Sequence, residues 1–350
     1  MRVEEKAIPI CGWAARRPRL LLCLALSAVT ALAFMLRLLN WPQVFVGQEV
    51  RFLESDCYYH MRRVFLAVAG GLRIPEYDLY MNYPQGFHCN WPPLFDQIIA
   101  GAALVLGLGR PSAHLIETVG ALLPPLLGAG TAAVVFFIAR FFMATPWALV
   151  SAFVFSFLPF HVQISVLGRP DHHVAVVLAA SLLVACALRL DREARPLTSA
   201  CHSVLMGLLL ALGLLLWVGS LLFVGILLAW FGVLFLLGLK KEPGSLDRVL
   251  LSGFGVFLSA GLFLWPAASH TSWAQAGELR WDALCSLHPL LLAACAAGFL
   301  LLRCAVMIVA MRRRREPDAF RGWRTKAYLA LYAVLALAVA FVVWSQLAPV

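Results

Sequence analysis

Two polar segments of this apolar chain carry residues suited to metal chemistry. The first runs from Glu54 to His60 and contains Asp56. The second reads Gly-Arg-Pro-Asp-His-His, and in it Asp171 and His173 are separated by one residue. A carboxylate and a nearby imidazole offer oxygen and nitrogen ligands that suit Mn²⁺, Mg²⁺ or Zn²⁺. An acid close to apolar surface is costly to bury unless it is paired or binds a cation.

Each of these acids also has a purely structural interpretation. Asp56 fits a solvated side chain, or the cap of a helix that starts close to it. Asp171 fits the cap of the helix that follows it, with His172 and His173 at the membrane interface. The spacing of these residues leaves both interpretations open.

Cysteines add a second candidate metal site. Cys57 and Cys89 lie in one polar stretch and are able to pair if it faces an oxidising compartment. Together with His60 and His88 they have the ligand types of a zinc site. The adjacent His-Cys pair and the missing Cys-x-x-Cys make the spacing poor, so this alternative is the weaker one.

Composition places these segments in a membrane protein. The chain is 62% hydrophobic and 13% charged, and its mean hydropathy is +0.85. Soluble domains have about 45–50% apolar and about 25% charged residues. The apolar residues form runs of about 20, long enough to cross the hydrocarbon core. We expect helices, because only helices and closed barrels satisfy the backbone in lipid and these runs are too long for barrel strands.

The runs predict an all-α polytopic membrane protein with about nine spans. They cover residues 20–37, 115–139, 146–167, 173–190, 200–218, 221–239, 249–267, 286–310 and 327–346. A further run, 94–108, is only marginally long. If it does not span, all clusters of Arg and Lys fall on one side of the membrane, as the positive-inside rule requires.

This topology sets the expected sides of the cell membrane. The basic tail 1–19 is cytoplasmic, the carboxy terminus at Val350 is external, and residues 38–114 form a long external loop containing short helices. The short loop 168–172 is then also external. Asp56 and Asp171 are therefore expected on the same face.

The net charge of +10 does not predict a nucleic-acid partner. Its basic residues lie in short loops between spans, whereas nucleic-acid binding needs a contiguous basic patch. A transporter would need ionisable residues inside its spans. Arg37 and Arg303 lie towards span ends, where their side chains can snorkel to the interface.

Four polar motifs follow one another along the chain: Asp56 with Tyr-Tyr and His-x-Arg, Tyr-Pro-x-Gly at 83–86, Trp-Pro-Pro-Leu-x-Asp at 91–96 and Gly-x-x-Asp-His-His at 168–173. In this order they resemble the catalytic subunit of oligosaccharyltransferase, of the archaeal and bacterial type within the GT-C glycosyltransferases. Residues 216–220 also resemble the family's Trp-x-Gly-Gly hairpin. The resemblance covers the whole chain and implies a GT-C type transmembrane helix bundle.

What the resemblance implies is a metal-dependent, inverting glycosyltransferase. Family members transfer an oligosaccharide from a polyprenyl-(di)phosphate lipid to asparagine of an acceptor polypeptide, and Mn²⁺ or Mg²⁺ holds the diphosphate leaving group. By match, Asp56 binds the metal and engages the acceptor amide, while Asp171 and His173 are metal ligands. Arg169 is a candidate contact to phosphate, without a family motif behind it.

Two family elements are expected to be absent. We expect neither the carboxy-terminal soluble domain with its Trp-Trp-Asp motif nor the loop with a catalytic-site glutamate, which would lie beyond Val350. Glu278 is a candidate substitute, although it lies one external loop too early and equally fits a solvated loop acid.

Three interpretations remain. The chain is an N-glycosylating enzyme, truncated or completed by a second polypeptide; a GT-C enzyme with a protein hydroxyl or lipid acceptor; or a non-catalytic protein that binds the lipid donor. The Asp-His-His motif favours the first over the second.

Overall fold

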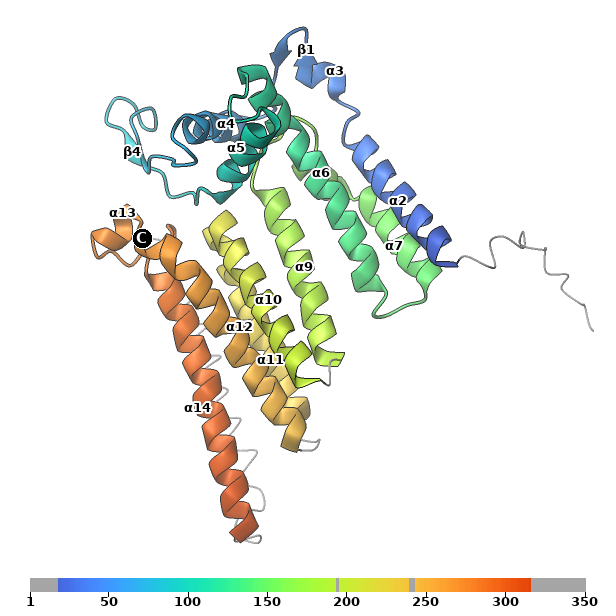
Figure 1. Cartoon of the computed structure of the whole chain (residues 1–350), viewed down its shortest axis with the longest axis vertical. Helices are drawn as coiled ribbons and strands as arrows, with labels where there is room; N and C mark the ends of the chain where they lie inside the picture. Colours follow the sequence, from blue (N-terminus) through green and yellow to red (C-terminus); the bar gives the residue numbers. More distant parts are fainter. Residues whose placement is uncertain (1–17, 193–194, 239–242, 316–350) are drawn as a thin grey trace, which may run out of the picture.

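The computed structural model describes residues 18–192, 195–238 and 243–315. Within them, long helices form a bundle and short elements lie across one of its ends (Figure 1). The elements are α2 (Pro18–Leu36), α3 (Trp41–Val44), β1 (Phe45–Val46), β2 (Glu49–Val50), α4 (Ser55–Ala69), β3 (Tyr77–Asp78), β4 (Phe87–His88), α5 (Leu94–Leu106), α6 (Ala113–Ala139), α7 (Thr145–Ser156), α8 (Pro159–Ile164), α9 (His173–Arg192), α10 (Pro196–Leu216), the 3₁₀ turn η1 (Val218–Ser220), α11 (Leu221–Gly238), α12 (Pro243–Ser269), α13 (Ser272–Gln275) and α14 (Leu287–Arg315).

Seven helices in the described part of the chain are long and apolar enough to cross a membrane. They are α2, α6, α9, α10, α11, α12 and α14, and each coincides with a predicted span. The predicted class, an all-α polytopic membrane protein, is confirmed. The predicted span 327–346 and nearly all of the basic tail lie outside the described residues.

The predicted span 146–167 is wrong as a single helix. Helix α7 has 12 residues and ends at Ser156, and a separate short helix, α8, begins at Pro159. Leu158 is extended, with ψ of 115°, which is the conformation that the residue before a proline favours. A straight helix of this length is about 18 Å long, shorter than the hydrocarbon core of about 30 Å.

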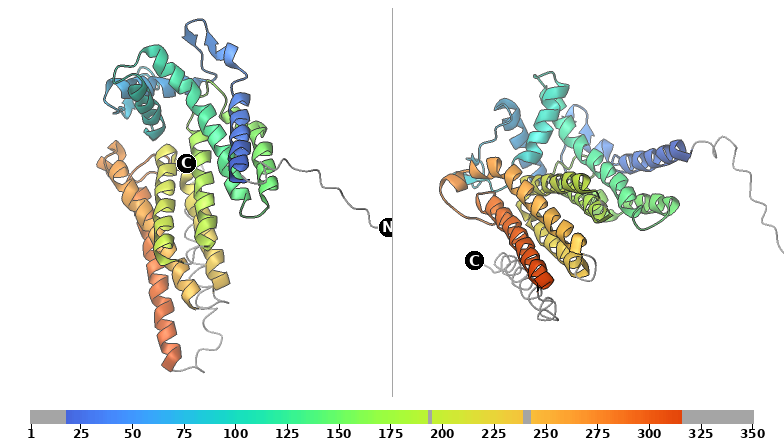
Figure 2. Two further views of the ribbon diagram at one scale, coloured as in Figure 1. Left: turned by 45° about the vertical axis from the view of Figure 1, so that its right-hand side comes forward. Right: turned by 60° about the horizontal axis from the view of Figure 1, so that its bottom comes forward.

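The long first loop forms a layer of short helices. Helix α5 has 13 residues, and with α4 it lies across the end of the bundle in all three views (Figures 1 and 2). Two small antiparallel hairpins, β1–β2 and β3–β4, accompany these helices. Side chains of α4, α5, α6 and α9 share one buried cluster, which includes Cys57, Met61, Val64, Phe95, Ile99, Ala103, Ile116 and Val176. This packing fixes the start of α4 close to the start of α9.

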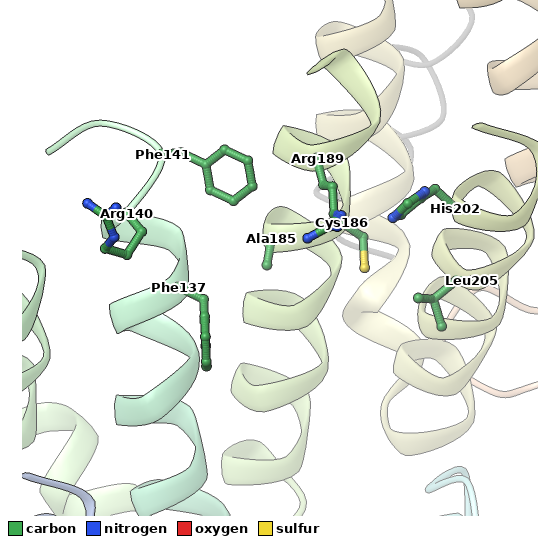
Figure 3. A pocket seen from close by; sticks show the side chains of 8 residues that line it. All are labelled: Phe137, Arg140, Phe141, Ala185, Cys186, Arg189, His202 and Leu205. Atoms are coloured by element: carbon green, nitrogen blue, oxygen red, sulfur yellow. The ribbon is translucent and has the colours of Figure 1, made fainter. Parts of the chain in front are cut away.

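Helix α9 therefore runs between two different environments. We call the end of the bundle where α9 begins, beneath α4 and α5, the loop end. We call the opposite end, where α9 finishes beside Arg189, the basic end. A cavity of about 540 Å³ opens at the basic end between α6, α9 and α10 (Figure 3).

Arg37 does not snorkel to the interface as predicted. Its side chain is fully buried, and its Nε donates a hydrogen bond to Ser165 Oγ at 2.7 Å. Its Nη1 donates to the carbonyl of Ala33 at 2.6 Å. Arg303 is instead paired with Asp247, at 2.7 Å between Nε and Oδ1. The expectation for Arg37 was wrong because distant parts of the fold supply acceptors that a single span does not show.

Candidate functional site

Helix α4 places Asp56 and His60 four residues apart, on the same face of the helix. Asp56 is exposed in the first turn, where the helix dipole favours a carboxylate. The hydroxyl of Ser55 donates a long hydrogen bond of 3.4 Å to it. His60 is buried, with 1% of its surface exposed. One face of α4 thus leads from an exposed acid to an enclosed imidazole.

The segment before α9 is held by the first loop and by α6. Gly168 has a φ of +76°, and a Cβ there would lie 2.8 Å from the side chain of Val44. Its N–H donates to the carbonyl of Ala121, and its carbonyl accepts from the N–H of Leu53, both at 3.1 Å. Glycine is required at this position because an ordinary side chain meets both a strained backbone and a close neighbour. The contacts fix the chain just before Asp171.

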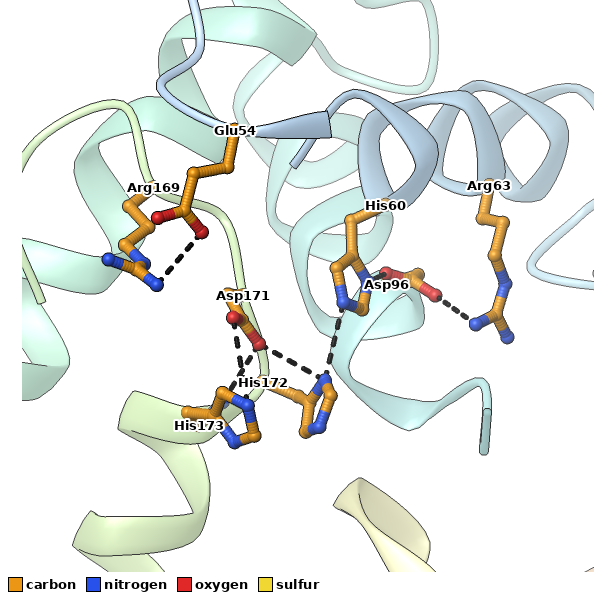
Figure 4. A network of polar contacts seen from close by, with 8 residues as sticks. All are labelled: Glu54, His60, Arg63, Asp96, Arg169, Asp171, His172 and His173. Carbon is orange, nitrogen blue, oxygen red and sulfur yellow. Dashed lines mark hydrogen bonds and ion pairs between the residues drawn. The ribbon is translucent and has the colours of Figure 1, made fainter. Parts of the chain in front are cut away.

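Asp171 is buried, with 6% of its surface exposed, and its two oxygens face different partners (Figure 4). Oδ1 accepts a hydrogen bond from the backbone N–H of His173 at 3.2 Å and lies 3.2 Å from His172 Nδ1. Oδ2 lies 3.9 Å from His173 Nε2. The His173 side chain is 46% exposed, and the Trp217 ring lies edge-on to it at 5.9 Å. Asp171 therefore binds the first backbone N–H of α9 and also presents an oxygen beside an accessible imidazole.

A buried network supports His60 from behind. Its Nδ1 lies 2.6 Å from Asp96 Oδ1, and its ring stacks on Trp91. Asp96 is fully buried, and its Oδ2 lies 3.2 Å from Arg63 Nη1. That contact is an ion pair without hydrogen-bond alignment. Because the carboxylate accepts the Nδ1 proton, the lone pair of His60 lies on Nε2.

His60, Asp171 and His172 form the one group of three metal-ligating side chains in the part of the chain that the structure describes. Their ligand atoms all lie within 4.8 Å of one another, and all three residues are buried. His60 Nε2 is 3.3 Å from His172 Nδ1. Burial lowers the pKa of His172 to about 3, although the Asp171 carboxylate opposes the shift. A neutral imidazole at physiological pH is available as a ligand or a hydrogen-bond partner.

The residues predicted from the sequence are only partly brought together. Asp171 and His173 are adjacent, but across the described residues no hydrogen bond or ion pair joins Asp56 to either of them. Arg169 Nη2 pairs with Glu54 Oε2 at 2.8 Å, which ties the start of α4 to the segment before Asp171. Glu278 is exposed after α13, and its Oε2 lies 3.8 Å from Arg280 Nη1.

The structure shows neither of the two alternatives that involve cysteines among the described residues. Cys57 and Cys89 are both free thiols, and they are not among the described residues that could jointly hold a metal. Cys57 packs into the buried cluster beneath α4, and burial raises its pKa to about 12. Cys89 lies against Tyr59 on another face of α4, and His88 packs against Trp273.

Sequence reasoning missed His60 and His172 as members of the central group, and it assigned no role to Asp96, although a motif ends at this residue. The spacing of Asp56 and His60 is a helical signal that could have linked them. An acid in the first turn of a very apolar helix, as Asp96 is, needs a buried partner. The cost of burying an acid therefore predicts that Asp96 has a partner, but the sequence does not identify which residue the partner is.

Comparisons with known proteins agree with this architecture. The family model described as "Oligosaccharyl transferase STT3, N-terminal" matches residues 21–267. The dolichyl-phosphooligosaccharide-protein glycotransferase 1 of Archaeoglobus fulgidus is 35% identical over 162 residues, which are 45% of this chain and 26% of that protein. The dolichyl-monophosphooligosaccharide-protein glycotransferase AglB of Haloferax volcanii is 27% identical over 151 residues, which are 43% of this chain and 14% of that protein.

Solved structures share the fold. The Archaeoglobus fulgidus oligosaccharyltransferase tethered to an acceptor peptide with the NVT sequon has a TM-score of 0.80 at 19% identity, over 94% of this chain and 39% of that chain. AglB from the same organism, in complex with an inhibitory peptide and a dolichol-phosphate, has a TM-score of 0.77 at 18% identity, over 93% and 37%. The complex with Zn and sulfate has a TM-score of 0.76 at 20% identity, over 91% and 39%. The match thus spans well under half the length of these relatives.

Proposed function

Because this chain belongs to the STT3 family of oligosaccharyl transferases, we propose that it binds a polyprenyl-(di)phosphate-linked oligosaccharide and takes part in its transfer to asparagine of an acceptor polypeptide. The matched relatives are named as enzymes of this kind. Structures of one relative contain a dolichol-phosphate and an acceptor peptide. The observation that carries the proposal is the position of Asp171 and its histidines at the loop end, inside the matched region and beneath the first loop.

A divalent cation, Mn²⁺ or Mg²⁺, fits the accessible side of Asp171. Oδ2 and His173 Nε2 are 3.9 Å apart, so the two side chains would approach each other by about 1 Å to become adjacent ligands of one octahedral ion with bonds of about 2.1 Å. Asp56, exposed on the start of α4, is the proposed third ligand and the group that engages the acceptor amide. Such an ion supplies positive charge to the departing diphosphate and orients the donor.

The buried side of Asp171 has a positioning role in this proposal. A proton on His172 Nδ1 has two acceptors, Asp171 Oδ1 at 3.2 Å and His60 Nε2 at 3.3 Å. Asp96 fixes the ring of His60. These partners fix Oδ1 of the Asp171 carboxylate on its buried side. Oδ2, on the accessible side, remains available to the cation.

A second donor set competes with the first. His60, Asp171 and His172 have ligand atoms within 4.8 Å of one another, and two imidazoles with one carboxylate suit Zn²⁺ better than Mg²⁺. A structure of one relative is a complex with Zn and sulfate, so Zn²⁺ belongs among the ions to be tested.

Metal titration of the purified full chain separates the two donor sets. We expect His173→Ala to weaken Mn²⁺ binding, followed by electron paramagnetic resonance, by at least tenfold, and His60→Ala to weaken it less. His114→Ala removes an exposed histidine at the start of α6 and is the matched control. If His60→Ala weakens Mn²⁺ binding and His173→Ala does not, the cation site would instead be the buried group of His60, Asp171 and His172.

Transfer is tested with the full chain, alone and with proteins that copurify from native membranes. The donor is a polyprenyl-diphosphate oligosaccharide, the acceptor an Asn-x-Thr peptide, and the control a Gln-x-Thr peptide. We expect glycopeptide with inverted sugar configuration, lost on chelation and in the Asp171→Asn variant. Donor binding without product on any acceptor would support a lipid-binding protein, and product on a hydroxyl or lipid acceptor would replace N-glycosylation.

The remaining assignments belong to the same proposal. Arg169 is proposed to reach the donor phosphate after release from Glu54, and Glu278 to substitute for the family's catalytic-site glutamate. We also propose that the basic end faces the cytoplasm, which puts the amino terminus inside the cell and the carboxy terminus outside. A second polypeptide that supplies the acceptor-reading domain is part of the proposal.

A further inference from the structure

The cavity at the basic end is separate from the candidate site. Its lining comes from three spanning helices and the turn after α6: Phe137, Arg140, Phe141, Ala185, Cys186, Arg189, His202 and Leu205. Helix α9 begins at His173 beneath the first loop, and Arg189 follows 16 residues later. At about 1.5 Å per residue, the two positions are about 24 Å apart along the helix axis. The cavity therefore opens towards the opposite membrane surface.

The lining combines positive charge with apolar walls. Arg189 and His202 lie on one side of the gap, and Arg140 lies on the other side with Phe137 and Phe141 (Figure 3). None of the lining residues is acidic. Phe137 has 54% of its surface exposed.

The two arginines are available for an anion. Both are exposed, and within the described residues neither takes part in an ion pair. Arg140 Nη1 donates to the carbonyl of Met143 at 2.7 Å, which leaves the other donors of its guanidinium free. Two guanidinium groups without an ion pair to any described residue, across one opening, favour a phosphate, because their planar donors match its oxygens.

We propose that this cavity binds the headgroup of an anionic phospholipid from the adjoining leaflet. A cavity of about 540 Å³ falls in the range of about 300–1,000 Å³ that is usual for small-molecule sites. Helix ends lie at the depth of lipid phosphates, and basic pockets between spans bind such headgroups. Phe137 and Leu205 offer an apolar wall to the acyl chains, which a soluble phosphate compound does not use. The inference does not depend on the proposed transferase activity.

Native mass spectrometry of the detergent-purified full chain tests the proposal. The probes are dioleoyl phosphatidylglycerol, dioleoyl phosphatidylcholine and glycerol 3-phosphate. We expect phosphatidylglycerol to bind more tightly than the other two. Each arginine near a lipid surface contributes enough for about a fivefold change in affinity, so Arg189→Gln and Arg140→Gln should each weaken phosphatidylglycerol binding about fivefold. Arg189→Lys keeps the charge but loses the planar donors, so it should weaken phosphatidylglycerol binding, although less than Arg189→Gln does.

Arg19→Gln is the matched control, because Arg19 is exposed on α2 at the same end of the bundle and outside the cavity. This variant should bind phosphatidylglycerol like the wild type. Equal weakening by all three glutamine variants would overturn the proposal in favour of diffuse surface charge. Glycerol 3-phosphate bound as tightly as phosphatidylglycerol would overturn it in favour of a soluble phosphate ligand.

Discussion

Replacement of Asp96 by Asn should destabilise the loop end strongly. Asp96 is fully buried, and its partner Arg63 has a side chain that is only 4% exposed. The asparagine still accepts the proton of His60 Nδ1, so the main effect is on charge. The variant leaves the Arg63 guanidinium buried without its carboxylate, and its hydrogen bond to the carbonyl of Trp91 at 3.0 Å does not replace that charge.

The size of the effect follows from the burial of both partners. Removal of one member of a buried ion pair costs about 3–5 kcal/mol, whereas replacement of both by apolar groups is often close to neutral. We therefore expect Asp96→Asn to lose about 3–5 kcal/mol and the double variant Asp96→Asn/Arg63→Met to recover most of it. With an unfolding entropy of about 2.1 cal/mol/K per residue, the single variant should melt about 4–7 °C lower.

The assay is thermal unfolding of the purified chain, followed by tryptophan fluorescence in one detergent. Both single variants and the double variant complete a double-mutant cycle, which isolates the coupling between the two side chains. An unchanged Tm for Asp96→Asn would show that Arg63 does not need this carboxylate. A double variant as unstable as the worse single variant would show that His60, rather than the ion pair, determines the loss.

Three further predictions follow from local geometry. Cys57, whose pKa burial raises to about 12, should resist maleimide at pH 8 in the folded protein and react only after denaturation, as peptide mass spectrometry would show. The Arg62 guanidinium lowers the pKa of Asp78 below its ordinary value of 3.8, so the pair stabilises the fold above that pH and less as the pH falls through the folded pKa. The Tm of the wild type should accordingly exceed that of Asp78→Asn at pH 6, and the difference should shrink in acid; a constant difference would contradict this. Gly168→Ala should lose about 1–3 kcal/mol through its positive φ and its contact, while Gly101→Ala, with open space around it, should be neutral or stabilising.

Most of the fold was predictable because composition alone identifies a membrane span. Seven predicted spans coincide with described helices. The failure at 146–167 shows the limit of this signal. Helix α6 continues through Pro124 and Pro125, whereas the helix is interrupted before Pro159. Whether a proline interrupts a span depends on which neighbours satisfy the backbone groups that it frees, and those neighbours are not adjacent in sequence.

The candidate site was predictable only where its residues are close in sequence. The spacing of Asp171 and His173 is visible in the chain, and the structure places them side by side. His60 and Asp96 are 36 residues apart, and His172 and His60 are 112 apart. Such contacts have no local periodicity, so the sequence shows a buried acid or imidazole without its partner.

The two halves of the candidate site belong to different layers of the fold. Asp171 and His173 lie at the start of a spanning helix, whereas Asp56 and His60 belong to the short-helix layer above it. Four kinds of contact join the layers near the site: the Arg169–Glu54 ion pair, the His60–His172 contact, the backbone bonds of Gly168 and the buried cluster beneath α4. A cation with ligands from both layers would bind only when the first loop is packed against the end of the bundle, which is here called the docked state. It would stabilise that state by mass action. Its binding energy would therefore strengthen the packing of the first loop on the bundle, and the packing of the spans at the basic end would be unchanged.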